Sequence, residues 1–533
     1  MASKTLLFDL PNELFLCIFQ YLSAIDLLKI FSDFKSYRLQ TLIQPFISRL
    51  DVSQESDEWI ENNLSNVLTK YKIIALRLQM NHLLMIPEHL LSTNIQSMQV
   101  INWNIFTDLP EQIIVHLRRN LKKLSFVQPN DDESSDLASL LFRSDSQLKH
   151  LIIKDCILYI SNDDLETCTR LTHLSIELEG MNPLFILIQH IPNLQELKVK
   201  IHSQECFRQT APNTNGVKLC NKLHSVTFTG WIKYFEHMES FFATFGSTIE
   251  YLSMNIDCRY YLFDGKRLEH GLLEKMPRLS SLDLIIFSPL VDNDPIEIET
   301  FQSFAWQNFN PIVYWNDVRA QQYMLFTLPY KSDHFDYFSN DFISNCVSNQ
   351  SISICFKRVR TLSLIATTPL NLETFLFIEK VFPNVTTIEL TRWIINPLDE
   401  SEEDRNVTIM SEDLLLDNSL QLPTVTKFCI SLWSPLNDYK TFRRFIQIFP
   451  NLICLELDTD QSLLHDILKH EHEDKFVKIV LARIEQLNIN YMDEKNTLTD
   501  TEIYYLFPNA KNLVKKNRYG SDKFYLLFNG IQK

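Results

Sequence analysis

The residues that could do chemistry lie closest together near the C-terminus, where three histidines have three acidic neighbours. They are His465, His470, Glu471, His472, Glu473 and Asp474. Imidazole and carboxylate groups are ligands that Zn²⁺ takes in proteins. If this segment is helical, His465 and His472 share a face, but His470 lies away from them. The three histidines therefore do not converge, and a solvated helix is the favoured interpretation.

Familiar catalytic motifs are missing from the chain. It has 8 glycines and contains no G-x-G-x-x-G, G-K-[ST], G-x-S-x-G or H-E-x-x-H. Phosphate cradles, hydrolase nucleophile elbows and zinc-protease sites need these residues. We therefore expect a non-enzymatic protein that uses no cofactor and no metal. The remaining catalytic alternative is an enzyme within residues 285–358, which would need a pocket with converging polar groups there.

Composition indicates a globular protein of the cytoplasm or nucleus. The net charge of −16 disfavours nucleic-acid binding, because phosphate contacts need a basic surface. The first residues, with Lys4 and Asp9, do not continue as a signal peptide, and no stretch reaches the roughly 18–20 apolar residues of a membrane span. The 10 cysteines include no C-x-x-C, which is typical of reduced, mostly buried thiols.

A six-residue phrase, apolar-x-x-apolar-x-apolar, recurs along most of the chain. Copies begin at Ile73, Ile95, Leu121, Leu148, Leu171, Leu194, Leu223, Ile249, Leu279, Val359, Val385, Val425, Leu452 and Ile484. The intervals, such as 171 − 148 = 23 and 223 − 194 = 29, match the leucine-rich-repeat period. The last two apolar positions face one side of a short strand, which can be buried only by stacking strands in a parallel sheet.

The segments between copies of the phrase are predicted to form crossover helices. Residues 181–188 are strongly apolar, and Ile191-Pro192-Asn193 ends that helix before the next strand. An apolar residue followed by Pro and then by Asn or Arg also precedes a copy at residues 276–278, 382–384 and 449–451. We therefore predict an α/β fold, a curved leucine-rich-repeat solenoid over residues 60–510 with parallel strands on the concave face and helices outside. Residues 511–533 are predicted to be a C-terminal cap or tail.

Two intervals break the period. Residues 285–358 are crowded with aromatics, and either degenerate repeats or a packed insertion, or else an aromatic anchor for a partner, would explain them. Residues 393–424 contain the acidic run 399–404, which has no means to pack and is predicted to be a mobile loop.

The first residues, near 5–50, do not carry the phrase and predict a helical module. Pro11 fits the first turn of a helix in which Leu14, Ile18 and Leu22 form one stripe. Asp26 is predicted to cap a second helix, with Leu27, Ile30, Phe31 and Phe34 facing inward. Such a module has more apolar surface than three short helices can hide. Docking to a partner and capping of the first repeat both remain open.

This module resembles the F-box motif. The matching residues are Leu10-Pro11-Asn12-Glu13-Leu14, Ile18-Phe19, Tyr21-Leu22 and Asp26-Leu27-Leu28. The last F-box helix often contains Trp and Cys. Residues 32–39 occupy the corresponding place here and contain neither.

An F-box ahead of leucine-rich repeats is the plan of a family of substrate receptors. The resemblance implies that the module binds a Skp-type adaptor, and through it a cullin-RING ubiquitin ligase, while the repeats select a target protein. It also implies that the module core and adaptor contact are formed by Leu10, Pro11, Leu14, Ile18, Phe19, Leu22, Leu27 and Leu28. The alternative is a repeat scaffold whose F-box-like module is only a cap.

A target is expected to bind the residues that flank the apolar pair on each strand. These are Arg77, Lys123, His150, Lys154, His173, Lys198, Lys200, Asp283, Glu389, Glu456 and Asp458. The early members are basic and the late ones acidic. The sequence therefore predicts a surface that changes from basic to acidic and a partner of mixed or opposed charge.

Overall fold

The structure is a computed structural model of the 533-residue chain. It describes residues 10–31, 36–91, 94–102, 111–127, 133–134, 137–160, 165–202, 220–258, 264–289, 298–301, 303–309, 311–316, 322–340, 342, 346–347, 356–365, 369–391, 409–417, 419–430, 439–458, 462–471, 474–491 and 499–517. The chain forms two compact units, residues 1–284 and 285–533, a division that the repeat phrase did not indicate. The acidic run 399–404 lies outside the described residues.

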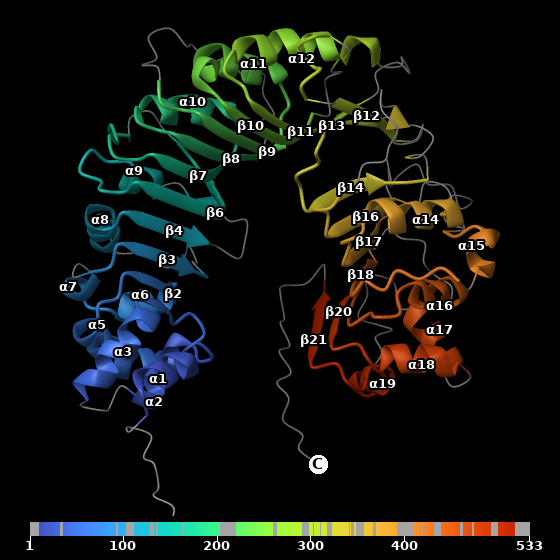
Figure 1. The fold of residues 1–533 in the computed structure, drawn as a ribbon, viewed down its shortest axis with the longest axis horizontal. Coiled ribbons are helices and arrows are strands. Elements are labelled where there is room, and N and C mark those ends of the chain that lie inside the picture. The colour runs from blue at the N-terminus through green and yellow to red at the C-terminus, as the bar shows by residue number, and fades with distance from the viewer. Residues whose placement is uncertain are drawn as a thin grey trace, which may run out of the picture. The chain divides into compact units, whose positions relative to one another are not determined.

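The first unit contains a long ladder of parallel strands (Figure 1), as the repeat phrase predicts. Its strands pair in chain order, with β5 (Glu133–Ser134) added beside β6. They are β1 (Arg49–Asp51), β2 (Ala75–Gln79), β3 (Ser97–Ile101), β4 (Lys123–Val127), β6 (His150–Leu158), β7 (His173–Leu178), β8 (Glu196–His202), β9 (Ser225–Trp231) and β10 (Tyr251–Asp257). Strand β11 (Ser281–Pro289) contains the boundary between the units.

The phrase sets the register of the ladder. Its fourth position falls on Leu76, Met98 and Leu124, which are aligned across neighbouring strands and buried. The carbonyl at its second position accepts two backbone N–H groups of the next copy, so Ile74 O is 2.9 Å from Gln96 N and 3.1 Å from Ser97 N. Equivalent carbonyls repeat along both units. Each strand therefore begins at the same level as its neighbour, and equivalent apolar residues of neighbouring copies lie side by side in the core.

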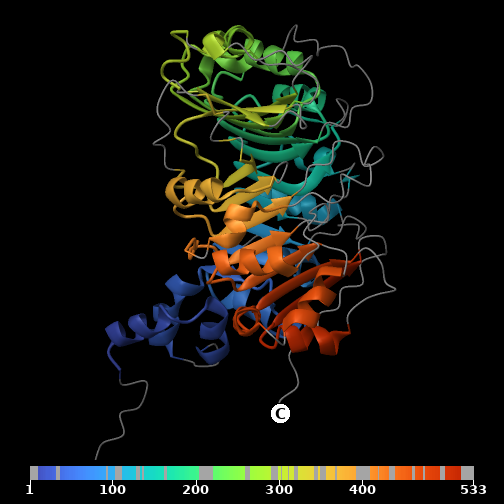
Figure 2. The same cartoon turned by 90° about the vertical axis from the view of Figure 1, so that its right-hand side faces the viewer.

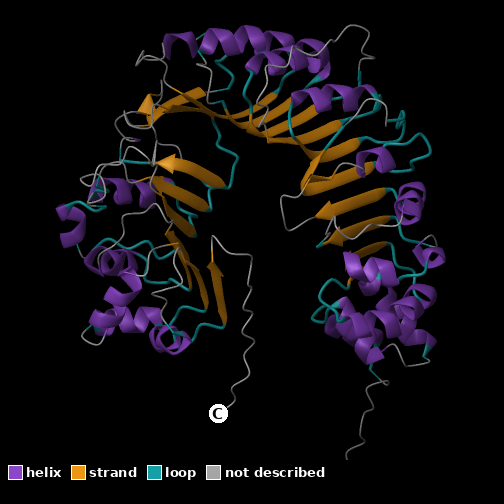
Figure 3. Ribbon diagram, turned by 180° about the vertical axis from the view of Figure 1, so that it is seen from behind, coloured by secondary structure: helices purple, strands orange, loops and turns teal. Residues whose placement is uncertain are grey.

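Short helices cover one face of this sheet, which leaves the other as a strand face (Figure 3). Beyond the N-terminal module they are α4 (Asp57–Trp59), α5 (Ser65–Lys70), α6 (Met80–Met85), α7 (Glu88–Leu91), α8 (Glu111–Asn120), α9 (Leu137–Leu141), α10 (Met181–Gln189), α11 (Phe235–Phe245) and α12 (Gly265–Gly271). Helix α10 matches the helix predicted over residues 181–188. Its Leu184, Leu187 and Ile188 are fully buried, which accounts for its apolar sequence.

The N-terminal module consists of α1 (Asn12–Phe19), α2 (Ala24–Phe31) and α3 (Tyr37–Ile47). These helices lie at the N-terminal end of the first unit and project to one side of its strands (Figure 2, blue). Helix α3 leads directly into β1, which pairs with β2 in parallel. The module is therefore built onto the first strand of the ladder.

Helix α2 is capped by Ser23 rather than by Asp26. The Ser23 hydroxyl accepts the N–H of Asp26 at 3.1 Å, and the Asp26 carboxylate accepts the N–H and hydroxyl of Ser23 at 3.2 and 2.7 Å. This reciprocal arrangement is a capping box, and the pair Ser23-x-x-Asp26 is its sequence signal. The inward orientation predicted for Ile30 is also wrong, because its side chain is exposed.

The second unit has its own parallel ladder, in chain order from β14 (His334–Phe338) to β21. The strands that follow β14 are β16 (Thr361–Ile365), β17 (Thr387–Thr391), β18 (Lys427–Ile430), β19 (Cys454–Asp458), β20 (Gln486–Tyr491) and β21 (Asn512–Asn517). Its helices are α14 (Leu372–Val381), α15 (Glu412–Leu416), α16 (Tyr439–Ile448), α17 (Ser462–Glu471), α18 (Lys475–Leu481) and α19 (Asp500–Leu506). The ladder thus continues into residues 511–517, which the sequence assigned to a cap or tail.

The interval 285–358 forms antiparallel strands and part of a core. Residues 285–289 of β11 pair with β13 (Gln322–Thr327), which pairs with β12 (Pro311–Asn316), and β12 pairs with β15 (Cys346–Val347). A cluster of buried aromatic rings, termed the aromatic core, follows these strands. It comprises Phe326, Tyr330, Phe335, Phe338, Phe342, Phe356 and Phe382. These rings act as packed core, whereas Phe304 is exposed.

The Pro-Asn pairs before the strands tie each repeat to the one before it. Asn384 Nδ2 donates to the Lys357 carbonyl at 2.9 Å, and Asn451 Nδ2 donates to the Pro423 carbonyl at 2.8 Å. Asn193 and Asn509 make the same bond to Thr169 and Ala482. The proline ends the helix, and the asparagine satisfies a carbonyl of the preceding turn.

Replacing Asn384 with alanine is therefore expected to lower the free energy of unfolding of the second unit by about 0.5–1.5 kcal/mol, the usual net worth of one hydrogen bond. Urea denaturation followed by hydrogen exchange of the β16 and β17 amides measures it. Asn384→Asp keeps the size of the side chain but removes the donor, so we expect a similar loss. An aspartate variant as stable as the wild type would contradict this role.

Candidate functional site

The first candidate site is an exposed apolar stripe on α1. The side chains of Leu14 and Ile18 are 49% and 41% exposed, and Pro11 and Tyr21 are exposed beside them. Leu14 and Ile18 lie about one turn apart on one side of α1, with Pro11 just before the helix and Tyr21 just after it. We call Pro11, Leu14, Ile18 and Tyr21 the α1 stripe.

The opposite side of α1 is held in the module core. Phe15 and Phe19 are buried, and the Phe19 ring lies 5.3 Å from Phe31 and 5.8 Å from Phe46. Arg38 of α3 fixes the start of α1, with its Nε 2.8 Å from Asn12 Oδ1 and its guanidinium 5.6 Å from the Phe15 ring. The stripe is therefore presented by an anchored helix.

The structure separates the eight residues predicted for core and adaptor contact. Phe19, Leu27 and Leu28 are buried, so they belong to the module core and not to a contact surface. Leu10 and Leu22 are half-buried, and only Pro11, Leu14 and Ile18 are exposed. The burial of Leu27 agrees with its predicted inward orientation and excludes it from the exposed surface of Leu14. Among the described residues, Tyr21 and Tyr37 are exposed aromatics that the contact set omitted, although Tyr21 stood in the quoted motif.

Contacts between the module and the first repeat include polar ones from α2 and α3. Gln44 exchanges hydrogen bonds with the backbone of Lys72 at 2.9 and 3.1 Å, and Lys29 pairs with Glu55 at 2.8 Å. These contacts use α2 and α3 and leave the α1 stripe uncovered by the described residues. The module therefore closes the ladder with one side and presents apolar surface on another.

The second candidate site is the strand face of the first unit between β4 and β8. The register brings Lys123, His150, His173 and Glu196 side by side on successive strands. The rings of His150 and His173 are stacked with centroids 4.1 Å apart. Glu196 lies 3.7 Å from His173 Nε2 and 2.9 Å from Lys198 Nζ.

Charges on this face follow from these contacts. Burial, and then the neighbouring His173 and Lys123, lower the pKa of His150 below its usual value. The bond from Lys198, opposed by burial and helped by the charge of His173, lowers the pKa of Glu196. Lys198 is thus neutralised within the face, whereas the positive neighbours of His150 outweigh the opposing charge of Glu196.

Glu177 is the buried carboxylate of this face. It accepts the Asp155 N–H at 2.9 Å, Lys200 Nζ at 3.0 Å and His202 Nε2 at 2.6 Å. Asp155 has φ of 57° and lies where the register of β6 against β7 shifts. Burial tends to raise the pKa of Glu177, but the Asp155 N–H, His202 and Lys200 outweigh it and lower the pKa. Glu177 therefore holds the bulge of β6 in place.

We expect Glu177→Gln to cost about 1–3 kcal/mol of unfolding free energy at pH 7, the usual penalty for disturbing a charged buried hydrogen bond. The lowered folded-state pKa means that this stability is present above the unfolded pKa, near 4.3, and is lost as pH falls through the folded-state value. Denaturation at pH 7 measures the cost of the substitution, and denaturation at pH 3 measures how much of that cost is lost at low pH. The variant and the wild type should differ less at pH 3, and an equal difference would contradict the assignment.

The structure also places the other residues predicted for the strand face and corrects the role of one of them. Asp283 is only 8% exposed, so it is a core group rather than a contact residue. Lys154 is exposed, and Arg77 pairs with Asp51 at 3.2 Å. In the second unit Glu456 pairs with Lys427 at 3.1 Å, and Glu389 lies 3.9 Å from His334. Asp458 ends β19, and its side chain lies outside the described residues.

The predicted change from basic to acidic along the strand face stays a prediction, and the structure adds that several of its members are paired with opposite charges. Each unit carries acidic and basic groups that neutralise one another, as Glu196 with Lys198 and Glu456 with Lys427 show. Cross-strand pairs of opposite charge stabilise a parallel ladder, so such groups also serve the sheet.

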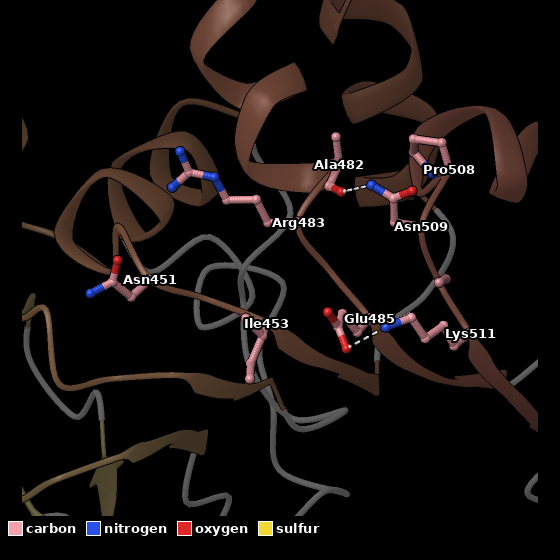
Figure 4. A pocket seen from close by; sticks show the side chains of 9 residues that line it. Asn451, Ile453, Ala482, Arg483, Glu485, Pro508, Asn509 and Lys511 are labelled. Atoms are coloured by element: carbon pink, nitrogen blue, oxygen red, sulfur yellow. Dashed lines mark hydrogen bonds and ion pairs between the residues drawn. The ribbon is translucent and has the colours of Figure 1, made fainter. Parts of the chain in front are cut away.

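A hollow of about 730 Å³ opens beside β20 and β21 (Figure 4). Its polar lining is already engaged, because Asn509 donates to the Ala482 carbonyl and Lys511 pairs with Glu485 at 3.0 Å. Arg483 donates to the Pro450 carbonyl at 3.1 Å. These groups join neighbouring repeats and do not converge on one point in the hollow.

The candidate metal ligands have other partners. Asp474 caps α18 and pairs with Arg443, while His470 Nδ1 lies 2.9 Å from the Asp466 carbonyl. His472 and Glu473 lie outside the described residues. In the part of the chain that the structure describes, no three such side chains are placed to hold a metal ion.

The described cysteines are free thiols, and most are buried. Burial raises the pKa of Cys168 and of Cys429 to about 12. Such thiols are protonated and unreactive at neutral pH, which suits packing rather than nucleophilic chemistry. Among the described helices, none has the length and apolar character needed to cross a membrane.

Comparison with known proteins finds likeness in structure only. No protein-family model matches the sequence, and no curated protein matches it. The crystal structure of a Rad7 and Elc1 complex in yeast is similar at 13% identity and a TM-score of 0.31, covering 78% of this chain and 92% of that chain. A TLR13–ssRNA13 complex is similar at 13% identity and a TM-score of 0.27, covering 89% of this chain and 62% of that chain.

Proposed function

We propose that this protein is the substrate-recognition subunit of a Skp–cullin–F-box type ubiquitin ligase. Helix α1 would bind a Skp-type adaptor, and through it a cullin, while the repeats bind a target protein. The observation that carries the proposal is the α1 stripe, where Leu14 and Ile18 are exposed at positions of the F-box resemblance. The chain itself would be non-catalytic and would act in the cytoplasm or nucleus.

The physical argument is the cost of leaving that stripe in water. A terminal module that only closes a solenoid needs a polar outer face for solubility. Here Leu14, Ile18 and Tyr21 face outward, at 49%, 41% and 88% exposure. Exposed apolar groups clustered on one helix favour a binding surface, and a helix that offers such anchors fits an apolar groove.

A second candidate function is a repeat scaffold with a non-recruiting cap. The observation that favours it is the continuity of α3 with β1, which closes the ladder whether or not a partner binds α1. The two functions differ in one respect, because only the ligase subunit needs the α1 stripe to be occupied in a complex.

The test is complex formation between the purified full chain and a purified Skp-type adaptor, followed by size-exclusion chromatography with light scattering. We expect a one-to-one complex that also retains a cullin. A full chain that stays free at micromolar adaptor would remove the ligase function and leave the scaffold.

A further inference from the structure

Three exposed lysines lie along β4 and β6 or just before β6, and none has an acidic partner among the described residues. Lys123 begins β4, Lys149 precedes β6, and Lys154 lies within β6. All three side chains are exposed. On the neighbouring strand β8, by contrast, Lys198 and Lys200 are paired with Glu196 and Glu177 at 2.9 and 3.0 Å.

His150 lies beside two of these lysines, Lys123 and Lys149, and their charges act on it. It is aligned with Lys123 across the ladder and follows Lys149 in sequence. Burial first, and then His173, Lys123 and Lys149, lower the pKa of His150, against a smaller opposing effect of Glu196. A group whose protonation is opposed from several sides marks a region of positive potential that an anion would relieve.

The geometry suits an extended peptide. Side chains on one side of an extended segment repeat about every 6.6 Å, so such a segment can place carboxylates at well-separated points of β4 and β6. Lys123 and His150 occupy one row, and Lys154 lies further along β6. Carboxylates on one side of an extended segment can therefore reach Lys123 and Lys154 at different points along its length.

We propose that Lys123, Lys149, His150 and Lys154 form a docking site for an acidic segment of a partner protein, rich in Asp or Glu and bound in extended form. The inference rests on the proposed function, because it names the class of target segment that the repeats select. We call these four residues the basic cluster.

Acidic protein is favoured over nucleic acid for two reasons. The chain has a net charge of −16, which repels a continuous polyanion. The basic cluster is also bounded by the carboxylates of Glu177 and Glu196 on the next strands. A short acidic segment can place its charge over the cluster alone, whereas a nucleic-acid backbone carries charge at every step.

The probe is a fluorescein-labelled peptide of six Glu-Gly repeats, titrated with the full chain at low salt and followed by fluorescence anisotropy. We expect saturable binding that weakens as salt rises, because exposed charge pairs are screened. Lys123→Glu with Lys149→Glu should weaken binding by at least about tenfold. The matched control is Lys380→Glu with Lys469→Glu, which makes the same charge change at two exposed lysines of the second unit and should leave affinity within about twofold.

Equal weakening in both double variants would overturn the site, since net charge alone would then explain binding. Tighter binding of a fluorescein-labelled 12-nucleotide oligouridine would overturn the choice of an acidic protein segment. Adaptor binding is measured on the same samples. An adaptor complex without peptide binding would remove the basic cluster and keep the proposed function, whereas peptide binding without an adaptor complex would do the reverse.

Discussion

The variant Leu14→Asp with Ile18→Asp is expected to lose the Skp-type adaptor, with affinity falling by at least about 100-fold. Both side chains are exposed on the α1 stripe, so carboxylates there meet water in the free protein and cost it little. In a complex each carboxylate would be buried in an apolar groove, and apolar anchors of this kind are worth about 2 kcal/mol or more each. Isothermal titration calorimetry measures the loss.

The matched control places two aspartates on exposed apolar positions elsewhere, Leu416→Asp with Ile479→Asp. It makes the same change in charge and hydrophobicity, and we expect adaptor affinity close to that of the wild type. Circular dichroism and thermal denaturation verify that both double variants stay folded. If the α1 variant binds the adaptor as tightly as the wild type, α1 is not the docking helix.

Phe335→Ala is expected to lower the unfolding free energy of the second unit by about 3–5 kcal/mol, the range for a buried phenylalanine removed from a packed core. The Phe335 ring is fully buried and lies 5.1 Å from Tyr330, 5.4 Å from Phe356 and 5.5 Å from Phe342. No neighbour can fill the space without leaving its own contacts.

Urea denaturation with hydrogen exchange of the β14 and β16 amides assigns the loss to the second unit, since two units need not unfold in one step. Phe304→Ala is the control, because Phe304 is exposed and lies in the same interval. We expect it to change stability by at most about 0.5 kcal/mol. A loss below about 1 kcal/mol for Phe335→Ala would show that the aromatic core is loosely packed.

The repeat phrase located most of the parallel strands. Three strands that it missed were missed for identifiable reasons. All of its copies from Ile73 to Ile249, and those at Val359 and beyond, precede parallel strands. The copy at Ile47 was missed because it lies where the helical module was assigned. Strand β14 was missed because Ser332 stands at the first position of the phrase, where an apolar residue is expected. The last copy, at Ala510, has Lys515 where an apolar residue is expected.

The sequence pattern did not predict the antiparallel pairing of strands in the interval 285–358. Residues 311–316 and 322–327 are mostly apolar or aromatic, which predicts strands but not their partners. Pairing of residues 285–289 with β13 depends on a contact between distant segments. Aromatic density did correctly indicate burial, because large rings seldom remain in water in such number.

The sequence by itself determined the α/β repeat architecture, because the spacing of apolar residues dictates which side chains share a face of a strand. It also determined the helical character of the N-terminal module. Only the tertiary structure decided which apolar residues are covered, leaving Leu14 and Ile30 in water. It also decided which charges are neutralised among the described residues, pairing Lys198 but not Lys123. Burial and ion pairing depend on neighbours that come from other repeats, and no local pattern specifies those neighbours.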